Sequence, residues 1–143
     1  MPDLRVRALQ LLTRREHSRA ELRGKLAPHA ESGEELEAVL DRLQAECLLS
    51  DQRYASQRVA TRGGRFGNAR LRHGLHRQGV ADEEIQAALP EAGDEAERCR
   101  AVWARKFGRI PETPAERARQ MRFLQYRGFS GNAISRVMRG ADE

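Results

Sequence analysis

The sequence predicts an all-α protein built as an elongated array of three tandem three-helix modules, with about nine short helices. Three observations lead to this prediction. Strand signals are nearly absent, because no segment sustains a Val/Ile/Thr/Tyr alternation and no Asn-Gly or Asp-Gly hairpin turn occurs. Helix-capping residues recur along the chain, and apolar residues return between them at spacings of three and four. A helix–turn–helix pattern is repeated three times.

The first module is expected over residues 1–50. Its helices are expected at about 4–15, 18–27 and 33–46. Ser18 with Glu21, and Ser32 with Glu35, have the spacing of capping boxes that begin the last two of these helices. The apolar helix faces consist of leucines three or four residues apart, namely Leu22, Leu26, Leu36, Leu40 and Leu43.

The second module is expected over residues 51–91 and the third over residues 92–143. Their helices are expected at about 51–62, 67–78, 82–89, 94–107, 114–127 and 131–139. The run Thr113–Glu116 combines an N-cap, a proline at the first helical position and a capping-box glutamate. Asp94 and Glu97 place acids at the start of the helix expected at 94–107, where a helix N-terminus favours them.

The internal repeat begins at a leucine in each module, Leu12, Leu75 and Leu124. In all three copies, apolar residues follow 10 and 14 positions later. Two copies have glycine at the expected helix C′ position, Gly79 and Gly128, where a positive φ is cheap only for glycine. Modules of this size seldom stabilise themselves alone, so we expect neighbours to stack in a line.

The amino-acid composition indicates which broad class of protein this is. The chain has 143 residues, of which 39% are hydrophobic and 33% charged, with no apolar run long enough for a membrane span. Its first residues have no apolar h-region, so we expect no secretory signal. Cys47 and Cys99 form neither a disulfide framework nor a zinc site and are expected to be buried thiols. A soluble protein of the cytoplasm is the expectation.

Charge is segregated into blocks along the chain, which has a net charge of +5. Residues 53–78 contain seven arginines and no acid, and residues 98–127 contain nine basic and two acidic residues. Residues 28–52 and 79–97 each contain seven acids. Opposite blocks either attract each other within the fold, or the arginines form a broken basic stripe for an anionic partner. Nucleic acid is the commonest such partner.

Catalytic motifs are absent, so we expect a protein that is not an enzyme and has no catalytic, cofactor-binding or metal site. The sequence has no phosphate-binding loop and no His-Glu-x-x-His. The glycine-rich run 63–67 is expected to be a loop between helices. His73 and His76 share one side of a helix, but no acid or cysteine lies near them in sequence to complete a metal site. His17 is expected to pack against or cap the second helix.

The candidate binding surface is formed by basic residues of the second and third modules. They are Arg53, Arg58, Arg62, Arg65, Arg70, Arg72, Arg77, Arg105, Lys106, Arg122 and Arg127. A solvated arginine face is one interpretation, and a surface that faces phosphates or acidic protein is the other and the preferred one. Phe66, in the central loop, is expected to anchor the loop, with base stacking as the alternative.

Three stretches of the chain form one ordered pattern: residues 8–26, residues 48–80, and residues 122–137 with the run Arg-Gly-Phe-Ser in their middle. Together they span nearly the whole chain, and through them it resembles the RecX family of bacterial recombination regulators. One departure concerns the Gly-Pro-Arg-Arg-like stretch with which the family usually opens its middle helix. This chain has Gly67-Asn68-Ala69-Arg70 there, which puts in doubt any role of the second arginine of that pair.

The resemblance implies binding to RecA filaments on DNA, with an elongated monomer lying in the filament groove. It implies inhibition of RecA's ATP hydrolysis, strand exchange and co-protease activity, and hence a role in DNA repair, recombination and the SOS response. Single- and double-stranded DNA are expected partners, contacted directly or through the filament, and no membrane partner is expected. The alternatives are a stand-alone helix–turn–helix transcriptional regulator that binds DNA, and an adaptor or chaperone without nucleic acid.

Overall fold

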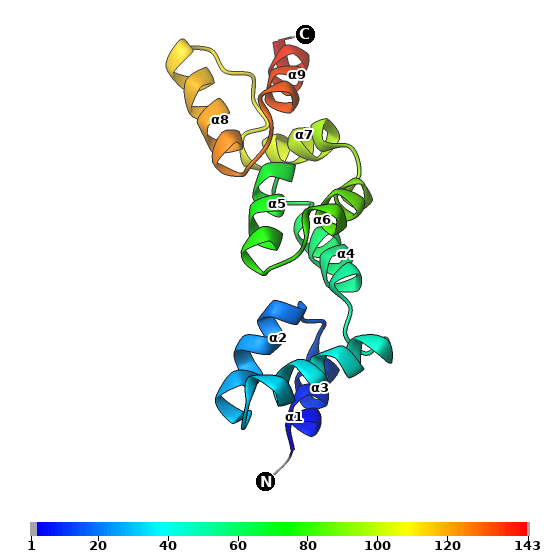
Figure 1. The fold of residues 1–143 in the computed structure, drawn as a ribbon. Helices are drawn as coiled ribbons and strands as arrows, with labels where there is room; N and C mark the ends of the chain where they lie inside the picture. The colour runs from blue at the N-terminus through cyan, green and yellow to red at the C-terminus, as the bar shows by residue number, and fades with distance from the viewer. Residues whose placement is uncertain (1–2, 143) are drawn as a thin grey trace.

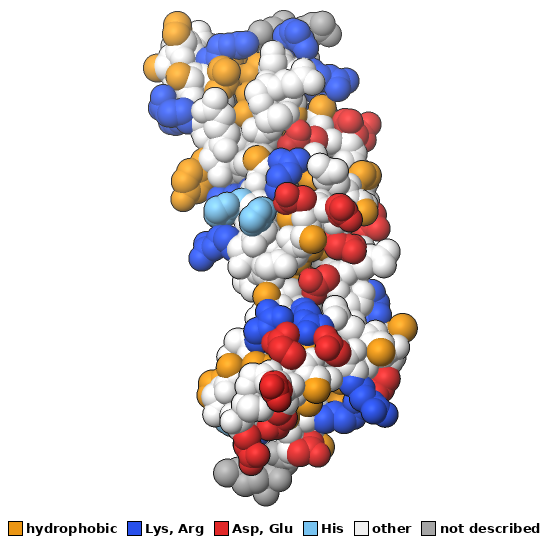
Figure 2. All heavy atoms as spheres, in the orientation of Figure 1, with side chains coloured by type: hydrophobic (Ala, Val, Ile, Leu, Met, Phe, Trp, Pro, Cys, Tyr) orange, Lys and Arg blue, Asp and Glu red, His pale blue; other side chains and the backbone are white. Residues whose placement is uncertain are grey.

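Residues 3–142, the part of the chain that the computed structural model describes, form nine α-helices, two short 3₁₀ helices and no strand. The helices gather into three bundles stacked along one axis, and the chain enters the array at one end and leaves it at the other (Figure 1). The space-filling view in Figure 2 has the same elongated outline. The predicted all-α array of three tandem modules is therefore confirmed.

The first module packs three helices around a small leucine core. Its elements are α1 (Leu4–Arg14), α2 (Arg19–Leu26), the 3₁₀ turn η1 (Ala27–His29) and α3 (Gly33–Ala45). The side chains of Ser18 and Ser32 accept hydrogen bonds from the backbone N–H groups of Glu21 and Glu35, so both predicted helix starts are confirmed. The core consists of Leu4, Ala8, Leu22, Leu26, Leu36, Leu40, Leu43 and Leu49.

The second and third modules repeat this plan, each with a core of its own. Their elements are α4 (Asp51–Arg62), α5 (Asn68–Arg77), α6 (Asp82–Ala88), η2 (Leu89–Ala92), α7 (Glu95–Lys106), α8 (Pro114–Tyr126) and α9 (Gly131–Asp142). The middle core centres on Tyr54, Val59 and Leu75, and the last on Trp103 and Met138. The expected module boundaries, after residues 50 and 91, stay predictions.

The repeated turns follow the predicted geometry in two modules out of three. Gly79 and Gly128 adopt φ values of +77° and +91°, and the next residue of each, Val80 or Phe129, is buried. In the first module His17 occupies that buried position, with only 1% of its surface exposed. The expectation that His17 packs is confirmed, and the cap itself is supplied by Ser18.

The two cysteines differ, and the prediction for Cys47 was wrong. Cys99 is buried in the third core, and burial raises the pKa of its thiol to about 12. Cys47 is exposed and has a φ of +61° just beyond the end of α3. Helical periodicity predicts side-chain direction only within a helix, and Cys47 lies past the end of one, where the left-handed conformation turns the chain toward α4.

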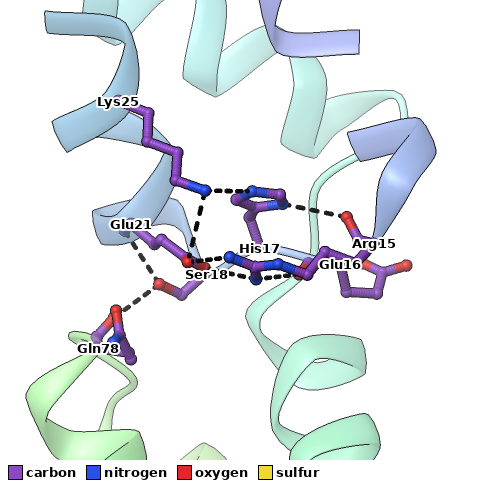
Figure 3. Close-up of polar contacts among 7 residues, drawn as sticks. All are labelled: Arg15, Glu16, His17, Ser18, Glu21, Lys25 and Gln78. Carbon is purple, nitrogen blue, oxygen red and sulfur yellow. Dashed lines mark hydrogen bonds and ion pairs between the residues drawn. The ribbon is translucent and has the colours of Figure 1, made fainter. Parts of the chain in front are cut away.

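The first junction, between modules 1 and 2, depends on side chains (Figure 3). The Ser18 hydroxyl donates to the carbonyl oxygen of Gln78 over 2.7 Å. The backbone N–H of Arg19 donates to the Asp51 carboxylate over 2.7 Å. One hydroxyl therefore both caps α2 and connects two modules.

The His17 ring lies between a carbonyl and a cation (Figure 3). Its Nδ1 is 3.0 Å from the Arg15 carbonyl oxygen, and its Nε2 is 3.1 Å from the Lys25 ammonium. A neutral ring with the proton on Nδ1 satisfies both contacts, because it donates to the carbonyl and accepts from Lys25. Burial, followed by repulsion from Arg15 and Lys25, lowers the pKa of His17, although the Arg15 carbonyl and the Glu21 carboxylate act in the opposite direction.

The second junction, between modules 2 and 3, is made by the backbone. The N–H of Gly67 donates to the Arg127 carbonyl over 2.9 Å, and the N–H of Ala69 donates to the Gly128 carbonyl over 3.1 Å. The Glu95 carboxylate accepts from the N–H of Asn68 over 2.8 Å. Three successive donors at the start of α5 are thus satisfied by the third module, so α5 is capped only when the two modules are docked.

Gly67→Ala is expected to destabilise this junction. An added Cβ would lie 2.4 Å from the carbonyl carbon and oxygen of Gly128, and backbone has to move to relieve that overlap. We expect a loss of about 1–3 kcal/mol in the free energy of unfolding, measured by urea denaturation. Gly74→Ala in the same helix is the control, because nothing lies within 4 Å of its added Cβ. It should gain about 0.5–1 kcal/mol, and equal effects of the two substitutions would contradict the docking described here.

Acidification is expected to destabilise module 1 through His17. Because the pKa of folded His17 lies below its ordinary value of 6.5, the unfolded chain binds the proton more readily. The contribution is complete above about pH 7 and is lost as the pH falls below 6.5 toward the folded pKa. His17→Phe, which copies the residue type at the equivalent turn of module 3, should flatten the dependence of unfolding free energy on pH between about pH 5 and 7. An unchanged slope in that variant would show that another group titrates.

Candidate functional site

Arginines of the first module face carboxylates. Arg5 and Arg42 pair with Glu46, Arg15 pairs with Glu21, and Arg19 and Arg23 pair with Glu37. The two arginines lower the pKa of Glu37 to about 2, chiefly through the hydrogen bond from Arg23. Attraction between opposite charges within the fold therefore accounts for these five arginines.

The candidate basic residues of modules 2 and 3 are different. Among the side chains that the structure describes, no carboxylate pairs with any of them except Arg53. Eight of them lie around the loop between α4 and α5 and are called the arginine surface below: Arg58, Arg62, Arg65, Arg70, Arg77, Arg105, Lys106 and Arg127. The fold brings together two charge blocks that are separated in sequence by an acidic one.

Two grooves run along the arginine surface, one on each side of that loop. The first, of about 150 Å³, lies between α4 and α5 and is lined by Arg58, Arg62, Phe66, Arg70, His73 and Arg77. The second, of about 240 Å³, is lined by Arg65, Arg105, Lys106, Phe123 and Arg127. Each groove combines apolar walls with several guanidinium groups, which suits a ligand with both anionic and planar parts.

Repulsion within the arginine surface is visible at Arg62. Its pKa is lowered chiefly by the positive charge of Arg58, then by burial and by the charge of Arg65. No described carboxylate offsets this repulsion with an ion pair. An anion in the first groove would relieve the repulsion, so the surface is complementary to negative charge.

Phe66 lies at the centre of the arginine surface. It is partly buried against the second core, which confirms its expected role as a loop anchor. The guanidinium carbons of Arg70, Arg127 and Arg65 lie 4.7, 5.3 and 5.7 Å from its ring centroid. These cation–π contacts hold three arginines beside one ring, and none of the three has an ion-pair partner among the described residues.

Arg98 holds the loop in place, although it was not among the candidates from the sequence. It is buried, and it donates to the carbonyls of Gly63 and Phe66 over 3.0 and 2.8 Å and to the Asn68 side chain. Burial lowers its pKa, and the nearby carboxylates of Glu95 and Asp94 oppose that shift. Its position beside Cys99, on the apolar face of α7, is a signal that could have identified it.

Three of the predicted residues lie elsewhere. Arg53 pairs with Glu16 over 3.0 Å in the first junction. Arg72 and Arg122 are exposed on α5 and α8 and line neither groove. His76 lies 3.7 Å from Asp82, and the described residues include no group of three or more metal-ligating side chains. No helix in that part of the chain is both long and apolar enough to span a bilayer.

Acidic side chains of the middle module gather on a different side from the arginine surface. Figure 2 shows acidic side chains on the right of the middle module and basic ones beside the histidines at its left edge. The first turn of α6 contributes Asp82, Glu83 and Glu84 to the acids of this module. The two signs of charge are therefore separated across module 2 as well as along the chain.

Comparisons with known proteins agree with this architecture. Models of the first, second and third three-helix domains of RecX match residues 5–43, 50–89 and 93–138. Regulatory protein RecX of Ralstonia pickettii is 49% identical over 99% of this chain and 89% of its own length. That of Ralstonia nicotianae is 51% identical over 98% of this chain and 89% of its own.

Solved structures show the same fold. The crystal structure of RecX from Lactobacillus salivarius superposes with a TM-score of 0.85 and 20% identity, covering 97% of this chain and 94% of that one. A second crystal structure, of a regulatory protein RecX, gives a TM-score of 0.81 over 98% of this chain. This chain therefore belongs to the RecX family of regulatory proteins, as the three matched domains and the relatives with 49% and 51% sequence identity show.

Proposed function

We propose that this protein binds RecA filaments on DNA and modulates RecA, mainly by inhibiting its ATP hydrolysis, strand exchange and co-protease activity. Membership of a family of regulatory proteins supports the proposal. The observation that carries it is the arginine surface, eight basic residues around two grooves that have no carboxylate partner in the described part of the chain. The protein acts in the cytoplasm as a monomer, by binding rather than by chemistry, in DNA repair, recombination and the SOS response.

The mechanism is steric and electrostatic. An elongated body in the helical groove of the filament spans neighbouring RecA subunits. The arginine surface faces DNA phosphate or acidic RecA surface, while the acidic side of module 2 lies away from it. A bound protein then blocks the addition of protomers, favours disassembly or occludes the substrate strand.

Rigid docking of modules 2 and 3 matters for this mechanism. The first groove lies within module 2 and the second between modules 2 and 3, and both border the loop that Arg98 and the Gly67–Arg127 hydrogen bond hold. Their relative position is fixed before binding. A polyanion therefore meets a surface that needs no reordering, which lowers the entropic cost of association.

For module 2, charge disfavours the alternative of a stand-alone helix–turn–helix regulator. In that motif the helix after the turn enters the major groove with its N-terminal residues. In module 2 this helix is α6, whose first turn carries three acids that DNA phosphates would repel. Random and selected duplexes should compete equally in a gel-shift assay, whereas sequence preference without RecA would support the regulator.

The test of the proposed function removes charge from one groove. The triple variant Arg58→Ala, Arg62→Ala and Arg77→Ala should raise the concentration for half-inhibition of RecA's ATP hydrolysis on single-stranded DNA at least about tenfold. If these residues contact phosphates, the negative slope of log affinity against log salt concentration should become shallower by about 2 to 3. A smaller loss with no change in slope would assign them to a protein contact.

A matched control removes the same charge from module 1. Arg5→Ala, Arg23→Ala and Arg42→Ala eliminate arginines that are already paired with carboxylates. This variant should inhibit RecA nearly as well as the wild type, with unchanged helical circular dichroism. Equal loss of inhibition in the two triple variants would overturn the assignment of the site, because net charge alone would then explain the effect.

A further inference from the structure

We propose that Tyr126 is a base-stacking residue and that the protein binds single-stranded nucleic acid directly, without RecA. The bound strand stacks one base on the Tyr126 ring and places its phosphates along the arginine surface. This inference deepens the proposed function, on which it rests for its biological setting, by naming the chemical class of ligand that the surface takes.

Tyr126 is conspicuous for its exposure. It is the last residue of α8, and 78% of its surface is accessible. The other large exposed hydrophobic residues, Val6, Leu48 and Ile110, are between 40% and 53% accessible. Tyr126 also lies beside the arginine surface, since its carbonyl accepts a hydrogen bond from the Arg70 guanidinium over 3.1 Å.

The Tyr126 ring forms one end of a stack. The guanidinium carbon of Arg70 is 4.7 Å from the Phe66 centroid and 5.4 Å from the Tyr126 centroid, so one planar cation serves two rings. The Phe66 end of this stack packs against the second core. The Tyr126 end is exposed, and a planar base is the group that would extend it.

Arg70 is held where this stack needs it. Its Cβ packs against Gly128, where an added glycine Cβ would come within 2.4 Å of it, and its guanidinium bonds to the Tyr126 carbonyl. The same junction that docks modules 2 and 3 thus aligns Phe66, Arg70 and Tyr126. The stack is built before any ligand arrives.

Phosphate-binding groups flank the stack on both sides. Arg127 follows Tyr126 in sequence, and its guanidinium lies 5.3 Å from the Phe66 centroid and 5.1 Å from the Phe123 centroid. The first groove continues from Arg70 to Arg58 and Arg62. A nucleotide chain alternates planar bases with phosphates, and this surface alternates an exposed aromatic end with guanidinium groups.

The combination favours a single strand over the other anionic ligands. In a duplex the base faces are already stacked on each other, so none is free for the Tyr126 ring. An acidic protein surface would satisfy the arginines but offers no row of planar groups. Proteins that bind single strands combine a basic groove with aromatic rings, and each stacked base contributes about 1–3 kcal/mol.

The experiment measures binding of the full-length protein without RecA. Fluorescence anisotropy is followed with an end-labelled oligothymidylate and with a chain of abasic phosphates of equal length. The wild type should bind the oligothymidylate more tightly. Tyr126→Ala should weaken that binding about 5- to 150-fold, while binding of the abasic chain stays the same. Tyr126→Phe keeps the ring and should stay within about twofold of the wild type.

Two controls separate stacking from other causes. Ile110→Ala removes another exposed apolar side chain and should change neither affinity. The triple variant of Arg58, Arg62 and Arg77 should weaken binding of both probes, because phosphates are common to both. Helical circular dichroism checks folding, which truncation of so exposed a side chain leaves intact.

Several outcomes overturn the inference. They are no measurable binding of oligothymidylate by the wild type, equal affinity for the two probes, or unchanged affinity in Tyr126→Ala. If any of these occurs while the arginine triple variant still loses inhibition of RecA, the proposed function stands and the arginines face protein or duplex. If stacking is confirmed but the wild type leaves RecA's ATP hydrolysis unchanged, the proposed function fails and the inference survives.

Discussion

The close approach of two backbones, at Gly67 and Gly128, is the contact on which the rest of modules 2 and 3 depends. Each module has its own core, and within residues 3–142 no apolar interior shared between modules holds the array together. Between modules 2 and 3, backbone hydrogen bonds from Gly67 and Ala69 take that role, and they form only because neither Gly67 nor Gly128 has a Cβ. Arg98 completes the contact by donating to the carbonyls of the loop on the other side. A joint made from obligatory backbone groups has few alternative arrangements, which makes it stiffer than one made from long side chains.

This second junction also positions the charged groups of Arg70 and Arg127. Arg127 accepts a hydrogen bond from Gly67 through its carbonyl and places its guanidinium beside Phe66. Arg70 likewise packs against Gly128 through its Cβ and bonds to the Tyr126 carbonyl through its guanidinium. Docking and ligand display therefore share the same residues and cannot vary independently. The first junction lacks this coupling, because its arginines already face carboxylates.

Local sequence patterns predicted the fold well because the physics that sets it is local. Caps and apolar spacings gave nine helices with ends within a few residues, and the repeat correctly paired the turns at Gly79 and Gly128. The site was harder. Counting charge placed Arg53 with the other arginines, but its partner Glu16 lies 37 residues away in sequence. Arg98 was missed because its partners are backbone carbonyls, which every residue has and no pattern marks. Asn68, the departure from the family stretch, proved to be a partner of Arg98.

Charge separation costs this fold little and benefits binding to a polyanion. The chain has 21 acids, and three of them, in the first turn of α6, follow the central arginine block closely in sequence, while acidic side chains gather on another side of the middle module (Figure 2). An exposed ion pair contributes only about 0–1 kcal/mol, so leaving the arginines without carboxylates sacrifices little stability. A polymer of phosphates releases a counterion at each contact, and those gains add along the surface. Repulsion at Arg62 slightly destabilises the free protein, and a bound anion relieves that repulsion. A surface whose charges are paired internally would have to break each pair before binding, and the described carboxylates form no such pair with the arginine surface.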